Sequence, residues 1–97
     1  MFAAALRVEF LIPQARSLKE KRKALAPLTK SLSSTLPVAA AEVNFAKMWQ
    51  RSAIGISFVF GNAAHIERLI STVGDYLDSH LEIDVVDVRI RHMEDMA

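Results

Sequence analysis

A run of cations near the start of the chain is the first group of residues whose types and spacing could do chemistry. Residues 14–30 of this 97-residue sequence hold six lysine and arginine side chains against one carboxylate, a net charge of +5. Residues 62–97 hold eight acids against three arginines, a net charge of −5, so the overall net charge of +1 hides the asymmetry. This distribution steers a polyanion or a complementary subunit towards the basic segment.

Four of these cations are candidates for nucleic-acid binding: Arg16, Lys19, Lys23 and Lys30. The three lysines share the helix face opposite a stripe of leucines, and Arg16 lies close to it. The helix start also has unpaired backbone amides and the positive end of the helix dipole, and both favour an anion. We therefore expect this basic start to contact the phosphates of RNA. A solvated helix face is the simpler interpretation of the same charges.

A second candidate contact is the segment Trp49-Gln50-Arg51, at the junction between a loop and a strand. Tryptophan and arginine are enriched in interface hot spots, and both stack on bases. Trp49 and Arg51 are therefore candidates for secondary contacts to nucleic acid. The alternative is that Trp49 only closes the end of the hydrophobic core.

Lys21 differs from the other lysines because its position on the helical wheel falls within the apolar stripe. Burial of an unpaired ammonium group is strongly unfavourable, so the side chain must reach water past the sheet edge or find a carboxylate. We expect a structural ion pair between Lys21 and Glu42, or between Lys21 and Glu9. Such a pair could imitate an acid/base pair, but a salt bridge explains the residues more simply.

Motifs for catalysis and for cofactor binding are missing from the sequence. The chain has no cysteine, which removes disulfides, thiolate zinc sites and cysteine nucleophiles. His65, His80 and His92 have no spacing that suggests metal ligands. There is no glycine-rich phosphate loop and no Gly-x-Ser-x-Gly sequence. We therefore expect a protein that is not an enzyme and that holds no cofactor and no metal.

Period-two alternation predicts the strands that must position these residues. From Phe2 to Ile12 the larger apolar residues fall on even positions, whereas Arg7 and Glu9 fall on odd positions. Three further strands are predicted over residues 38–44, 52–60 and 82–92. In the last of them we expect Val86, Val88 and Ile90 to face inward and Asp87, Arg89 and Arg91 to face outward.

Two helices are predicted from apolar stripes and capping residues. Ser17 followed by Glu20 has the form of a capping box, so the first helix begins there. Pro27 lies inside its pattern and removes one backbone hydrogen bond, which predicts a bent or two-part helix. Asn62 can cap the second helix, which Gly74 weakens without breaking.

The order βαββαβ favours an α+β fold, a ferredoxin-like two-layer sandwich in which two helices cover one face of a four-stranded antiparallel sheet. The length allows one domain over residues 1–97. The other sheet face stays open, and a homodimer formed through it is the alternative to an RNA-binding role. An RNA-recognition motif is not expected, because its central strands need exposed aromatic residues.

No apolar run approaches the roughly 20 residues of a membrane span, and Arg7 and Glu9 interrupt the apolar start of the chain. We therefore expect a cytoplasmic protein that does not contact a membrane. The absence of cysteine is typical of that compartment.

Several short segments resemble a known family when they are taken together and in order: Ser17-Leu18-Lys19-Glu20-Lys21-Arg22, Ala41-Glu42-Val43, Trp49-Gln50-Arg51 and Ala63-Ala64-His65. They are similar to the YlxP-like family of small uncharacterised bacterial proteins, over almost the whole chain. The resemblance implies a ferredoxin-like fold and a bacterial cytoplasmic origin. It also implies a gene neighbourhood shared with translation initiation and ribosome-binding factors, which favours a connection to RNA or the ribosome. It supplies no catalytic residue.

Overall fold

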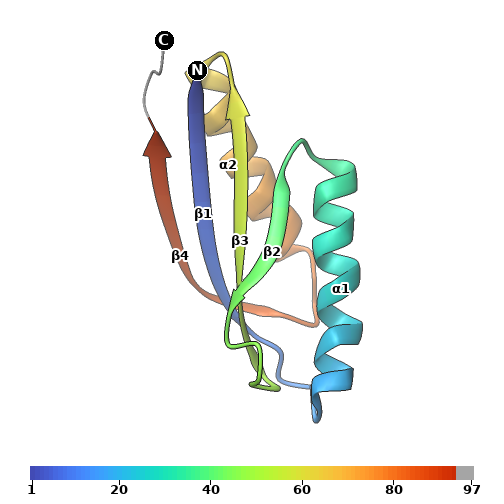
Figure 1. The fold of residues 1–97 in the computed structure, drawn as a ribbon. Helices are drawn as coiled ribbons and strands as arrows, with labels where there is room; N and C mark the ends of the chain where they lie inside the picture. The colour runs from blue at the N-terminus through green and yellow to red at the C-terminus, as the bar shows by residue number, and fades with distance from the viewer. Residues whose placement is uncertain (94–97) are drawn as a thin grey trace.

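A computed structural model of the protein describes residues 1–93 and contains the six elements in the expected order (Figure 1). Their bounds are β1 Phe2–Leu11, α1 Leu18–Thr35, β2 Ala39–Asn44, β3 Arg51–Phe60, α2 Ala63–Asp78 and β4 Asp84–Met93. The strand ends differ from the predicted ends by no more than two residues, as terminal residues commonly do. None of the helices within residues 1–93 has the length and apolar character needed to cross a membrane.

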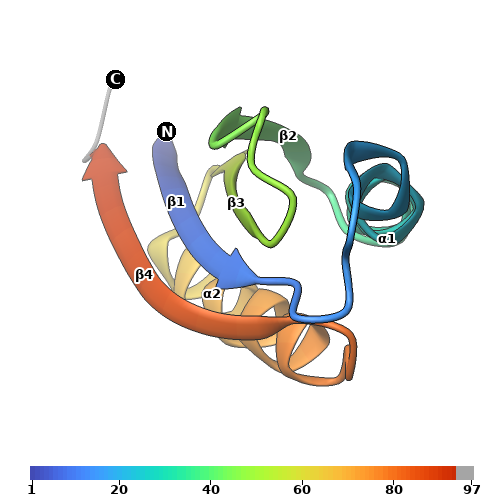
Figure 2. The same ribbon diagram turned by 90° about the horizontal axis from the view of Figure 1, so that it is seen from below.

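The four strands form one antiparallel sheet in the order β2-β3-β1-β4, with β1 and β3 in the centre. α2 packs against β1, β3 and β4, and α1 packs against β2 (Figure 2). The fold is therefore the ferredoxin-like α+β sandwich that the sequence predicts, with one sheet face left open.

The core lies between the sheet and the helices. Every second side chain of the strands and one apolar stripe of each helix point into it. The central strands contribute Leu6, Val8 and Phe10 from β1 and Ile54, Ile56 and Phe58 from β3. The helices contribute Leu25, Leu28 and Leu32 from α1 and Ile66, Leu69, Val73 and Leu77 from α2. Burial of these side chains is the main favourable contribution to folding, because the free energy gained scales with the apolar area removed from water.

Pro27 does not divide α1, so the prediction of a two-part helix is wrong. The helix is continuous over Leu18–Thr35, and Figure 1 shows no sharp kink in it. Pro27 is exposed on the side of α1 away from the core. The carbonyl of Lys23, which would accept a hydrogen bond from an amide at position 27, is therefore within reach of water.

The prediction that Val86 faces inward is also wrong, because the pairing of β1 with β4 contains a bulge. Val88 lies opposite Val8 and Val85 lies opposite Phe10, so Val86 is the extra residue between two regular stretches of the ladder. The bulge turns Val85 towards the core and leaves Val86 exposed.

Candidate nucleic-acid interface

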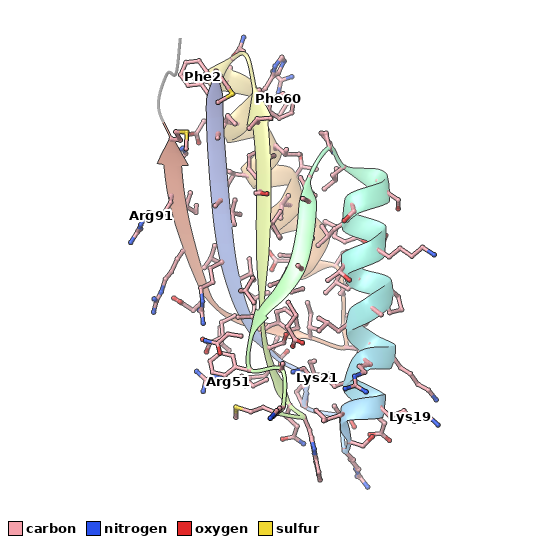
Figure 3. All side chains as sticks on the ribbon, in the orientation of Figure 1. Phe2, Lys19, Lys21, Arg51, Phe60 and Arg91 are labelled. Atoms are coloured by element: carbon pink, nitrogen blue, oxygen red, sulfur yellow. The ribbon has the colours of Figure 1, made fainter. Side chains whose placement is uncertain are left out.

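The outer side of α1 is a cationic surface. Arg16, Lys19, Lys23 and Lys30 are exposed, and within residues 1–93 none of the four makes an ion pair. Figure 3 shows Lys19 extending from α1 away from the sheet. From Lys19 to Lys30 the helix rises by about 16 Å, so the lysines form a stripe rather than a single point charge.

The start of α1 carries its own carboxylate. Ser17 Oγ accepts a hydrogen bond from the amide of Glu20, and the Glu20 carboxylate accepts one from the amide of Arg16. These two bonds are a variant of the expected capping box, in which the carboxylate reaches one residue further back. Because this negative charge lies at the positive end of the helix, the attraction of α1 for a polyanion depends mainly on the lysine side chains.

Lys21 lies on the other side of α1, between the helix and the end of the β2–β3 hairpin (Figure 3). It is 1% exposed, and its Nζ lies 2.8 Å from Glu42 Oε2 and donates to the carbonyl of Phe45 at 2.6 Å. The same Glu42 oxygen accepts a 2.6 Å hydrogen bond from Ser52 Oγ. Of the two carboxylates considered, Glu42 is therefore the partner, and its interactions compensate the desolvation of the ammonium group.

Phe45 holds the hairpin loop in the conformation that Lys21 binds. Its backbone φ is +61°, in the left-handed region that non-glycine residues rarely adopt, and its amide donates to Asn44 Oδ1 at 2.8 Å. Its carbonyl accepts from the Met48 amide as well as from Lys21. Sequence reasoning missed this residue, because nothing in the sequence marks a phenylalanine as the carbonyl acceptor of a distant lysine.

Arg51 is engaged within the chain. Its Nε and Nη2 both donate to Glu9 Oε2, at 3.1 Å and 2.6 Å, and its guanidinium lies 4.1 Å from the centre of the Phe45 ring. Arg7 approaches the other Glu9 oxygen at 3.4 Å. The cation–π contact and the ion pair of Arg51 hold the loop against the open face. Binding of nucleic acid by Arg51, as the sequence predicts, would therefore have to compete with these two contacts for the guanidinium group.

Glu9 is expected to make stability depend on pH. Its side chain is 14% exposed, and the hydrogen bonds from Arg51, followed by the charges of both arginines, lower its pKa below the usual value, although burial partly opposes them. A lowered folded-state pKa means that the stabilisation is present above the unfolded pKa of about 4.3 and is lost as pH falls through the folded value. In urea unfolding, the free energy of unfolding of wild type should exceed that of Glu9→Gln by a constant amount from about pH 7 to pH 5. Below about pH 4 this difference should shrink. A difference in the free energy of unfolding that grew as the pH fell would contradict a lowered pKa of Glu9 in the folded protein.

Trp49 is 53% exposed and lies outside the core, so the interpretation that it closes the core is wrong. With Leu11 and Met48 it lines a hollow of about 510 Å³, whose rim includes Lys47 and Arg51. Gln50 fixes the loop, because its side chain donates to the carbonyls of Pro13 and Ala15 and its own carbonyl accepts from the Ile12 amide. Trp49 is thus held next to the segment that leads into the basic helix.

The two arginines of β4 that the sequence predicts to face outward lie on the open face and make short-range contacts. Arg89 Nε is 3.1 Å from Asp87 Oδ2, and Arg91 donates to the carbonyl of Ile90. On β1 and β3, which are described in full, the face turned away from the helices carries no aromatic side chain: Ala3, Ala5, Arg7, Glu9, Leu11, Arg51, Ala53, Gly55, Ser57 and Val59. This face lacks the stacking rings of an RNA-recognition motif.

The three histidines lie apart. The ring of His65 contacts Phe60, the ring of His80 contacts Tyr76, and His92 is on β4 opposite Ala4. Over residues 1–93 no three histidine or acidic side chains gather in a way that could hold a metal ion.

Two comparisons with known proteins agree with one another. A family model described as "Protein of unknown function (DUF503)" matches residues 3–90. The Uncharacterized protein YlxP of Bacillus subtilis (strain 168) is 32% identical over 76 residues, which cover 78% of this chain and 83% of that relative.

Proposed function

The chain belongs to the DUF503 family of proteins of unknown function, and from that premise we propose that it is a cytoplasmic, non-enzymatic factor that binds RNA or the ribosome through the basic start of α1. The comparisons confirm the resemblance to the YlxP-like family. The description of that family assigns no activity, so the support for this role comes from the surface of the chain itself.

The observation that carries the proposal is that the lysines on the outer side of α1 form no ion pair with any side chain of residues 1–93. The ion pairs within residues 1–93 use Arg7, Lys21, Arg51 and Arg89, whereas Lys19, Lys23 and Lys30 have none. Cations that neutralise phosphates release condensed counterions, and this release supplies much of the affinity of a protein for nucleic acid. A stripe about 16 Å long matches an extended polyanion better than a single small anion.

Trp49 supports the choice of RNA over other polyanions. An exposed indole beside apolar side chains can stack on an unpaired base, and such stacking contributes about 1–3 kcal/mol per base. The hydrogen bonds from the Gln50 side chain to the Pro13 and Ala15 carbonyls hold the neighbouring Trp49 beside the segment that leads to Arg16. Arg51 supports the loop through Phe45 and Glu9, and it contacts RNA only with the part of its guanidinium that those contacts leave exposed.

The Lys21–Glu42 pair is better explained by a structural role than by a catalytic one. A catalytic base or acid needs a lone pair or a proton that faces a substrate. Here the Lys21 ammonium is directed at Glu42 and at the Phe45 carbonyl, and the Glu42 oxygen also accepts from Ser52. Both groups are therefore used to join α1 to the hairpin.

The salt dependence of binding tests the proposal directly. We expect purified protein to bind structured ribosomal RNA and ribosomal particles, with the logarithm of the association constant falling at a slope of roughly −3 against the logarithm of salt concentration for four phosphate contacts. Fluorescence anisotropy with labelled RNA and co-sedimentation with particles, between about 50 and 300 mM KCl, measure that slope. If neither probe binds at the lowest salt concentration, or if binding does not weaken with salt, the proposal is wrong.

A second candidate function is a homo-oligomeric interaction module that uses the open sheet face. The observation in its favour is a shallow hollow of about 730 Å³ on this face, lined by residues that include Ala3, Ala5, Ala39, Val59, Arg91 and Met93. Gly55 on the same face has no room for a side chain, because Val43 Cγ1 lies 2.8 Å from where a β-carbon would stand. The masses of wild type and of a Val59→Lys variant in solution test this function. A lysine in the centre of such an interface would abolish the association that wild type shows.

A further inference from the structure

The two edges of the sheet differ in how well they are protected. β2 is a short strand of six residues that follows Pro37, contains a register shift at Val43, and packs against α1. These are common ways of preventing a sheet edge from pairing with another chain. β4 is a strand of ten residues with β1 on one side, and among the elements of residues 1–93 none lies on its other side (Figure 1). The β4 edge is therefore the one available for pairing.

Apolar side chains are exposed along the β4 edge. Val86 is 51% exposed and Val88 is 48% exposed, although Val88 lies opposite the buried Val8 and points to the helix side of the sheet. Residues exposed because their strand is the last in the sheet become buried when a further strand is added. Together with the unpaired backbone groups of the edge, these valines are what a partner strand would cover.

The sequence of β4 is complementary to itself when the strand is reversed. If Val88 of one copy lies opposite Val88 of a second copy in an antiparallel pair, Asp87 of each copy lies opposite Arg89 of the other. Opposite charges directly across a ladder stabilise it, and like charges destabilise it. Centring the pair on Asp87 or on Arg89 instead places two identical charges opposite each other, so Val88 is the favoured centre.

We propose that β4 docks onto β4 of a second copy of this chain, with the two-fold axis at Val88. This inference is independent of RNA binding, and it uses a different surface from the open-face module. The side chains of Asp87 and Arg89 are 44% and 67% exposed and already lie 3.1 Å apart within one chain. Pairing adds the same two groups from the second copy, which produces a cluster of four alternating charges on the open face.

The two sheets then join into one continuous sheet, because a two-fold axis perpendicular to a sheet keeps the open faces of both copies on the same side. In each copy β2 is the strand furthest from β4, and α1 packs against β2. The two lysine stripes therefore lie at the outer ends of the pair, where the dimer contact does not cover them.

Sedimentation equilibrium of the full chain tests the proposal over loading concentrations from about 10 μM to 1 mM, the range of Kd for a small transient interface. We expect the weight-average mass to rise from 10.8 kDa towards twice that value. Val88→Lys should raise Kd by about tenfold or more, because two like charges then meet at the axis. Val59→Lys on the open face should leave Kd unchanged. A wild-type mass that stays at that of one chain overturns the proposal, and so does loss of association in Val59→Lys but not in Val88→Lys.

Reversal of the charges at positions 87 and 89 tests which residues of the two β4 strands lie opposite each other. Both side chains are on the open face, so the core side of the strand is unchanged. Asp87→Arg and Arg89→Asp should each be monomeric, since each places like charges opposite each other. An equimolar mixture of the two variants should associate, because every position 87 then faces an opposite charge at position 89 of the other chain. Circular dichroism of each variant checks that it is folded. If the folded variants associate alone as wild type does, or fail to associate when mixed, the Val88-centred pairing is wrong.

Discussion

Replacement of Glu42 by alanine is expected to lower the free energy of unfolding by about 3 kcal/mol, because removal of one partner from a buried ion pair leaves the other charge uncompensated. Lys21 is 1% exposed, and without Glu42 its ammonium keeps only the Phe45 carbonyl as a partner. The Glu42 side chain is itself 25% exposed, which places the effect at the lower end of the range for buried pairs. Urea unfolding at pH 7 measures the change.

Two further variants make that result specific. Lys21→Met should cost less, about 1 kcal/mol, because methionine keeps the packing of the stem and Glu42 keeps Ser52 Oγ and access to water. Glu67→Ala, which removes an exposed carboxylate from α2, should change stability by no more than about 0.5 kcal/mol. A loss below about 1 kcal/mol in Glu42→Ala would show that the pair does not hold the hairpin to α1.

Charge reversal at Lys19, Lys23 and Lys30 is expected to weaken RNA binding by a factor of about 100 or more. If each lysine contributes about 1 kcal/mol of attraction to phosphate, as a cation does beside an anionic surface, the three together amount to roughly two decades in affinity. The slope of the logarithm of affinity against the logarithm of salt should also become shallower, by about one unit for each phosphate that the variant no longer neutralises. Anisotropy titrations of the triple Lys→Glu variant against labelled ribosomal RNA measure both changes.

The matched control reverses the charge of the same number of cations outside α1, one on α2 and two on β4. Arg68→Glu, Arg89→Glu and Arg91→Glu together give the same net charge, and all three side chains are exposed. This variant should keep binding within a few-fold of wild type, since only the overall field changes. If the two triple variants lose affinity equally, the attraction comes from net charge and not from α1. If only the control loses affinity, the interface lies on α2 or β4 and not on α1.

The interior of the fold could be predicted from the sequence because burial imposes a period on each element. Even positions of β1 and the leucines of α1 are apolar for this reason, and they form the core as expected. The same reasoning placed Lys21 inside the apolar stripe and therefore required a partner for it. Local capping was also predictable, since Ser17 and Asn62 act within two or three residues of themselves.

Two predictions from local sequence were wrong because contacts beyond the local segment, or the side of the helix that faces water, decided the structure. Val86, Val88 and Ile90 alternate without a break in the sequence, but pairing of Val85 with Phe10 forces a bulge that turns Val86 outward. Pro27 predicted a bent or two-part helix, but the carbonyl that it deprives of a partner lies on the solvent side of α1, and the helix continues as one element over Leu18–Thr35.

By itself the sequence determined the order of the elements, the α+β class and the concentration of cations on one side of α1, because these follow from spacing along a single segment. Only the tertiary structure decided that Lys21 pairs with Glu42, since Glu9 lies on the sheet face turned away from α1. It also decided that Arg51 is held by Glu9 and Phe45 while Trp49 stays exposed. Each of these contacts joins residues that are far apart in the chain, and its geometry depends on strand register, which no local pattern specifies.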